Sequence, residues 1–154
     1  MPEHEQPRYA LRVTFEYEGA QVRMISRQRV EMTSLPSHAR DGYERHVGFW
    51  YELRDATNKT VYRRVIHNPI QADYEVFSSE GSVARRPIAN PRGTFEIVVP
   101  ELTGAPHLVL YGTLHPPTAP VGSPSAEAIR PPVPRVGTEP AREIARFNLL
   151  EGLP

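Results

Sequence analysis

Two apolar runs on either side of a polar break make up residues 46–67, and this stretch constrains the fold more than any other. The break at residues 55–59, between runs rich in β-branched and aromatic residues, predicts a β-hairpin. Alternation along its first arm puts Trp50 on one face and Val47, Phe49, Tyr51 and Leu53 on the other. Because both faces carry aromatic side chains, we expect a central strand of a layered structure. Trp50 would then lie between two sheets, and a loop, a tail or a partner would cover the opposite face.

Alternating apolar and polar residues predict further strands along the chain. We expect these strands at residues 9–17, 21–32, 73–77, 93–99 and 107–114. A bulge or a bend is expected near Ser26, and the polar stretch 33–45 is expected to be a surface loop. Residues 78–92 are expected to form a long polar excursion, with Val83 and Ile88 as possible anchors to the core. Seven short strands without a long helix indicate an all-β fold, a two-sheet antiparallel sandwich.

The last quarter of the sequence changes in composition and divides the chain into segments. We expect an N-terminal extension at 1–8, a β-sandwich domain at 9–114, a Pro-rich extended segment at 115–141 and a strand-like segment at 142–154. The Pro-rich segment cannot form a core of its own. The apolar pattern that follows it fits a strand or a helix, and we favour a final edge strand.

Composition excludes several classes of protein. The chain has no Cys, which removes disulfides, thiolate metal sites and Cys nucleophiles. Its opening is not that of a signal peptide, and no apolar run is long enough to cross a bilayer, so we expect a cytoplasmic protein. The formal net charge is +0 with both signs interspersed, which argues against nucleic acid and against membranes as partners.

A resemblance follows from the strand order, from Trp50 and from the run GTFEIVVPELTGAPHLVLYG. Together they resemble an immunoglobulin-like or fibronectin type III-like sandwich, in which a late hairpin carries alternating aliphatic residues. The resemblance covers residues 9–114 and lacks the Cys pair of true immunoglobulin domains. FWYELRD and VYRRVIHNP also resemble small β-sandwich accessory domains found beside metallopeptidases and other modules in bacterial proteins. The zinc motif of such a peptidase has no counterpart here, so the resemblance implies a companion and not a catalyst.

Local motifs for catalysis or metal binding are missing from the sequence. The His residues are scattered, and no two stand two, three or four positions apart, as neighbouring ligands of one metal do. His46 and His67 could meet across the central hairpin, but we favour ordinary polar roles for them at the strand ends. We therefore expect no catalytic residue, no metal and no cofactor. A hydrolase whose site converges from distant loops stays an alternative.

Two arginine pairs are candidate binding residues: Arg63 with Arg64, and Arg85 with Arg86. They either contact phosphate or an acidic partner, or they form ion pairs with Glu side chains on neighbouring strands. The balanced charge favours the ion pairs. A nucleic-acid-binding β domain that uses Arg and Tyr is a further alternative.

Two segments near the C-terminus are candidates for contact with a protein. Pro131, Pro132 and Pro134 either dock in an aromatic groove or belong to a plain linker. Ile144 and Phe147 must be covered, either by this chain's own sheet or by a partner. The leading expectation is a non-enzymatic interaction or structural accessory module that contacts a larger protein, an assembly or an oligomer.

Overall fold

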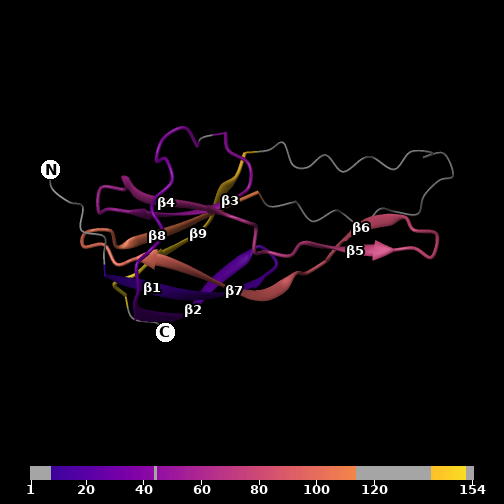
Figure 1. The fold of residues 1–154 in the computed structure, drawn as a ribbon, viewed down its shortest axis with the longest axis horizontal. Coiled ribbons are helices and arrows are strands. Elements are labelled where there is room, and N and C mark those ends of the chain that lie inside the picture. Colours follow the sequence, from indigo (N-terminus) through magenta and orange to yellow (C-terminus); the bar gives the residue numbers. More distant parts are fainter. Residues whose placement is uncertain (1–7, 44, 114–139, 152–154) are drawn as a thin grey trace.

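The protein folds into antiparallel β-sheets, in a computed structural model that describes residues 8–43, 45–113 and 140–151 (Figure 1). No helix occurs in these ranges, which confirms the prediction of an all-β protein. The described part of the chain therefore has no helix long and apolar enough to cross a membrane. Almost all of the predicted Pro-rich segment lies outside the described residues.

The first sheet has three strands in the order β2-β1-β7: β1 is Tyr9–Glu18, β2 is Gln21–Glu31 and β7 is Arg92–Pro100. In the β1–β2 register, Thr14 pairs with Ser26 and Phe15 pairs with Met24, so Ile25 is an extra residue on β2. This confirms the bulge predicted near Ser26. The bulge lets Met24 pack against the core beside Phe15.

The second sheet has four strands in the order β4-β3-β8-β9: β3 is Phe49–Arg54, β4 is Thr60–Ile66, β8 is His107–Gly112 and β9 is Arg142–Asn148. The predicted central hairpin forms β3 and β4. The terminal segment forms β9, an edge strand whose Phe147 pairs with Leu108 of β8. Arg27 of β2 donates a hydrogen bond to the carbonyl of Leu149, which ties the adjacent edges of the two sheets together.

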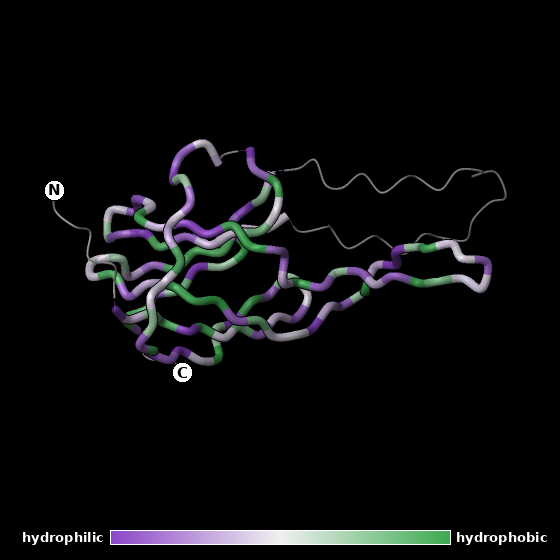
Figure 2. The backbone as a smooth tube through the Cα atoms, viewed as in Figure 1, coloured by the Kyte–Doolittle hydropathy of each residue, from purple (hydrophilic) through white to green (hydrophobic). Residues whose placement is uncertain are grey.

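The core lies between these two sheets, which face each other in a sandwich-like arrangement (Figure 2). The ring of Phe15 stacks on Phe95 within the first sheet and contacts Phe147 of the second, both at 5.1 Å between centroids. Phe49 of the second sheet meets Phe95 edge-on at 5.9 Å. Aromatic side chains from both sheets therefore interdigitate, which is the packing that holds two stacked sheets together.

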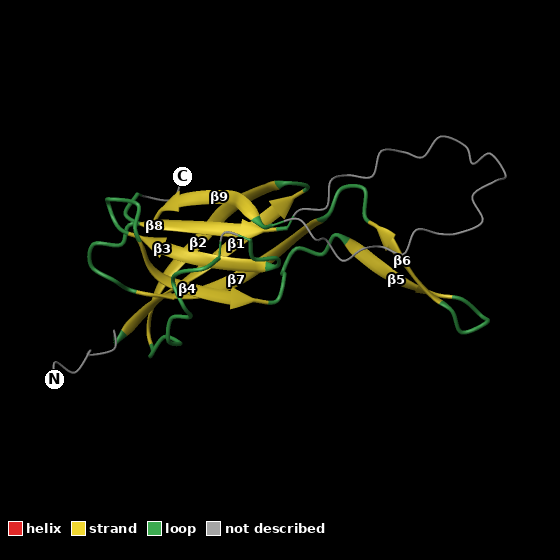
Figure 3. Cartoon of the chain, turned by 90° about the horizontal axis from the view of Figure 1, so that it is seen from above, coloured by secondary structure: helices red, strands yellow, loops and turns green. Residues whose placement is uncertain are grey.

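A third, two-stranded sheet projects from this body as a hairpin, which we call the arm (Figures 1 and 3). It consists of β5 (Asp73–Phe77) and β6 (Val83–Pro87), with Phe77 paired to Val83 next to the turn. The prediction of a polar excursion without a strand at 78–92 is therefore wrong for Val83–Pro87, which form β6, and Val83 is exposed rather than anchored in the core. Gly81, with a φ of +81°, closes a tight turn in which Ser78 N–H donates to Ser82 O at 2.9 Å, and this turn returns the chain along β5.

The root of the arm is fixed by a close contact between Tyr17 and Gly93. A Cβ at Gly93 would lie 2.6 Å from the Tyr17 hydroxyl and 2.8 Å from its ring, so glycine makes room for the Tyr17 side chain. The Tyr17 hydroxyl accepts a hydrogen bond from Gln71 N–H at 3.2 Å, and the neighbouring Ile70 is buried in the core. The chain therefore enters the arm from an anchored position.

Two expectations about the body need correction. Trp50 does not lie between the two sheets, because Phe49, Tyr51 and Leu53 fill the core side of β3 and Trp50 points to the other side. The late hairpin on which the immunoglobulin-like resemblance partly depends is also not formed. β7 pairs with β1, and β8 pairs with β3 and β9, so these two consecutive strands belong to different sheets.

Candidate interaction surface

The outer face of the four-stranded sheet carries a buried group that we call the charged cluster: Trp50, Glu52, Arg54, Arg63 and Tyr111. The Glu52 residue is only 1% exposed. Its Oε1 accepts hydrogen bonds from Trp50 Nε1 at 3.2 Å and from the Nε and Nη2 of Arg63. Its Oε2 accepts from Arg54 Nη2 at 2.7 Å and from Thr60 Oγ1 at 3.0 Å. Both oxygens are fully used by the protein's own donors.

The loop between β2 and β3 covers this cluster. Tyr43 from the loop meets Trp50 edge-on at 5.5 Å, and the Arg63 guanidinium lies over the Tyr43 ring at 4.1 Å. His46 also meets Trp50 edge-on, and Tyr111 of the adjacent strand stacks on Trp50 at 5.2 Å. These contacts explain why Trp50 is 2% exposed without facing the core. A loop cover was expected on the face of Phe49, Tyr51 and Leu53, but the loop covers the opposite, Trp50 face.

Electrostatics give the charged cluster a structural role. Burial raises the pKa of the Glu52 carboxyl, but hydrogen bonds and charge from Arg63 and Arg54 outweigh burial, so the pKa lies below its ordinary value. Burial also raises the pKa of the Tyr111 hydroxyl. A carboxylate with a lowered pKa and saturated oxygens is a poor proton acceptor for a substrate. Glu52 therefore holds the loop and the sheet together.

The same loop caps the free edge of β4. His38 N–H donates to Arg63 O at 2.8 Å, Arg63 N–H donates to Ser37 Oγ at 3.0 Å, and Val65 N–H donates to His38 Nδ1 at 3.0 Å. A sheet edge whose polar groups are satisfied in this way does not accept another strand at those positions.

Beside this cap lies a hollow of about 800 Å³, which we call the edge cleft. Its apolar lining comes from the loop, from β4 and from the end of β7, namely Leu35, Pro36, Val61, Tyr62, Pro100 and Leu102. Ser34, Arg40 and Asp41 are among the polar residues of the lining. Ser34 Oγ is buried and has no hydrogen-bond partner within the described residues.

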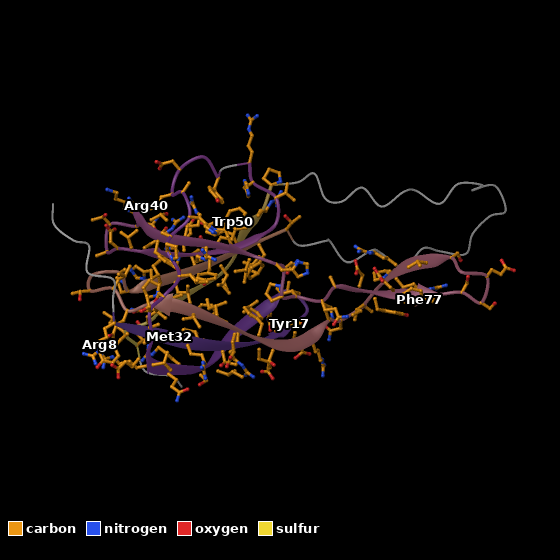
Figure 4. All side chains as sticks on the ribbon, viewed as in Figure 1. Arg8, Tyr17, Met32, Arg40, Trp50 and Phe77 are labelled. Atoms are coloured by element: carbon orange, nitrogen blue, oxygen red, sulfur yellow. The ribbon has the colours of Figure 1, made fainter. Side chains whose placement is uncertain are left out.

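The arm exposes the large apolar side chains that the body hides. Phe77 is 71% exposed, Val83 is 55% exposed and Tyr74 is 48% exposed. Phe77, labelled on the arm in Figure 4, and Val83 face the same side because they are paired across the hairpin, next to the turn. The sequence contains only a partial signal for this hairpin, since a Ser- and Gly-containing turn at 78–82 follows the strand pattern of 73–77, whereas 83–87 has no apolar pattern. These three residues are the strongest binding candidates that the sequence analysis missed.

The four candidate arginines lie in two different regions of the molecule, two on β4 and two on β6 of the arm. Arg63 is buried in the charged cluster, and Arg64 donates to the carbonyl of Pro36, so both hold the loop against β4. Arg63 is therefore not available to a partner, contrary to the candidate role given above. Arg85 and Arg86 are exposed on β6, and Arg85 lies 3.5 Å from Glu75 on the paired strand. The expected ion pairs between strands thus form at Arg63 and Arg85.

Of the candidate contact residues near the C-terminus, the structure describes Ile144 and Phe147, and both pack within this chain's own fold. Phe147 contacts Phe15, and Ile144 and Phe147 pack against the core cluster. Their role as contacts for a partner is therefore corrected, because this chain covers them itself. Pro131, Pro132 and Pro134 lie outside the described residues.

His46 and His67 do not form a metal site with other residues. His46 packs on Tyr43 and Trp50, and His67 is exposed. Across residues 8–43, 45–113 and 140–151, no three His, Asp or Glu side chains come close enough together to hold a metal ion.

No protein-family model, no curated protein and no solved structure matches the chain. The inferences about function therefore depend on the geometry of the arm, the edge cleft and the charged cluster.

Proposed function

We propose that this chain is a non-enzymatic interaction module that contacts a larger protein or an assembly. In this proposal an immunoglobulin-like, two-sheet sandwich is the scaffold and the arm is the contact surface. The observation that carries it is the exposure of Phe77, Val83 and Tyr74 on a hairpin that projects from the body. Exposed apolar side chains gathered on one element are typical of contact sites.

The energetics of the arm support this role. A single two-stranded hairpin is marginally stable in water, and every residue of β6 is exposed, so the arm adds little to the core. Aromatic side chains such as Phe77 and Tyr74 supply large contact areas in protein interfaces. The exposed Arg85 and Arg86 give the arm a polar rim around these residues. The arm thus has the composition of a protein interface, with exposed aromatic residues and a polar rim.

The charged cluster supports the same proposal indirectly. Its buried carboxylate is saturated by internal donors, and Arg63 holds the loop in place through the carbonyl of Ala39 and the ring of Tyr43. The most polar buried site of the described residues therefore maintains the scaffold and leaves recognition to the arm.

Photo-crosslinking tests the proposal. Phe77 is replaced by the photoreactive analogue p-benzoylphenylalanine in the cells that make the protein, and Gln28, an exposed residue of β2, receives the same replacement as a control. Irradiation should give a defined protein adduct from position 77 and none from position 28. An absence of adducts at position 77, or equal adducts at both positions, would refute the arm as a contact surface.

A further inference from the structure

The arm tip and the edge cleft are both apolar. The tip of the arm presents Phe77 and Val83 as one adjacent apolar pair. The edge cleft is a hollow of about 800 Å³ with an apolar lining, and Leu35 at its lip is 63% exposed. An aromatic side chain that enters such a cleft buries roughly 150–250 Å². The molecule therefore carries both an apolar projection and an apolar hollow that receives one.

The charges beside these two features are complementary. Glu80 lies in the turn at the tip of the arm, and Arg40 lies at the edge cleft; both are exposed. Within the described residues neither side chain forms an ion pair. Asp41 at the cleft has the same sign as Glu80 and lowers this complementarity in part. A tip seated in the cleft would bring Glu80 toward Arg40.

One chain cannot make this contact with itself. Phe77 lies near the far end of the arm, whereas Arg40 lies on the body toward the opposite end of the long axis (Figure 4). The tip and the cleft must therefore come from different molecules.

We propose that the arm tip of one copy of this chain docks in the edge cleft of a second copy. The inference rests on the proposed function, because it names the partner of the arm. The contact joins two different surfaces, so each copy keeps a free tip or a free cleft after one contact forms. Repetition of the contact gives rings or open chains.

The size of the contact predicts a weak association. The tip contributes few side chains, and interfaces smaller than about 1,200 Å² belong to weak and transient complexes. We therefore expect self-association that is detectable at high protein concentration and is lost on dilution.

Sedimentation equilibrium of the full chain, from low micromolar to millimolar concentration, tests the inference. The average mass should rise with concentration in the wild type and stay that of a monomer in Phe77→Ser. Arg40→Glu and Glu80→Arg should each raise the dissociation constant about tenfold, because like charges then meet. Arg12→Glu, a charge reversal on the outer face of β1, is the matched control and should change nothing.

A mixture of the two charge variants gives the decisive result. In equal amounts, Arg40→Glu and Glu80→Arg restore opposite charges at every mixed contact, so association should return toward the wild-type level. If Phe77→Ser prevents association while Arg40→Glu has no effect, the tips meet one another or another surface, and the inference is overturned. It is also overturned by a monomer at every concentration. In that case a crosslink from position 77 to a different protein still supports the proposed function, whereas no crosslink refutes both.

Discussion

The body and the arm place the same residue type in opposite environments. Phe49 on β3 is 1% exposed, whereas Phe77 on β5 is 71% exposed, although both are strand residues in antiparallel hairpins. The difference arises from the layers around each hairpin. β3 has a sheet against one face and the covered charged cluster against the other, while no described residues form a layer against either face of the arm (Figure 3). A phenylalanine stabilises the fold in the first position and is free for contact in the second.

We therefore expect stability and binding to depend on different regions of the molecule. Every residue of β3 except Arg54 is buried, and every residue of β6 is exposed. The free energy of folding thus comes from the body, since burial of apolar surface is its main source. Substitutions in the body should lower the stability of the protein, and substitutions in the arm should leave it intact.

Removal of β9 should have the largest effect. A chain that ends at residue 141 loses Ile144, Phe147 and Leu149 from the core and leaves β8 as a free edge. Loss of one buried Leu such as Leu149 costs about 2–5 kcal/mol, against a typical total stability of about 5–15 kcal/mol. We expect the truncated protein to be largely unfolded, as measured by thermal melts followed by circular dichroism.

A substitution at the same end of the chain is the control for that truncation. Leu150→Ser changes a side chain that is 80% exposed and should keep the wild-type melting temperature. Equal melting temperatures of the truncated and full-length proteins would contradict the role of β9 in closing the body.

Glu52→Leu should have the next largest effect. Removal of the carboxylate leaves Arg63 buried without its charged partner, and breaking a buried ion pair costs about 3–5 kcal/mol. Glu16→Leu is the matched control, because it removes an ion pair with Arg23 that is exposed on the first sheet and contributes less than about 1 kcal/mol. Urea unfolding measures both values. Similar losses in the two variants would mean that the charged cluster is not a buried network.

Acid conditions give an independent test of the same carboxylate. The pKa of Glu52 is lowered in the folded protein, so the folded state binds this proton less readily than the unfolded chain does. Its stabilisation is therefore present above the unfolded pKa of about 4.3 and is lost as the pH falls through the lowered folded-state pKa. Glu52→Gln should lose less stability than the wild type over this acid range. Equal losses of stability in the wild type and in Glu52→Gln would contradict a lowered pKa of Glu52 in the folded protein.

Sequence patterns predicted the strands of the body, but not the environment of Trp50. Alternation identifies β3 and shows that Phe49 and Trp50 lie on opposite faces, but it does not say which face meets the other sheet. Trp50 is buried because the β2–β3 loop folds over it with Tyr43 and His46, a long-range contact that no local pattern encodes. The terminal strand was predicted because β9 keeps its apolar pattern after the Pro-rich segment.

Only one of the two strands of the arm, β5, was predicted from the sequence. β5 has the apolar alternation of a strand, whereas β6 contains Arg85, Arg86 and Pro87, which are uncommon in buried strands. A strand that no other layer covers needs no apolar face, so β6 lacks the periodicity on which the sequence analysis relied. Because residues 83–87 have no strand pattern, no hairpin was expected there. Phe77 and Val83 were therefore not recognised as a candidate contact surface.

The smallest expected change in stability is that of Phe77→Ser. At low protein concentration it should alter the free energy of unfolding by less than about 0.5 kcal/mol, because the side chain is already largely exposed to water. At high concentration the wild type should melt at a higher temperature than the variant, since association stabilises the folded state by mass action. Melts at both concentrations measure the difference. A large destabilisation at low concentration would show that the arm supports the body and would remove the contrast between the two regions.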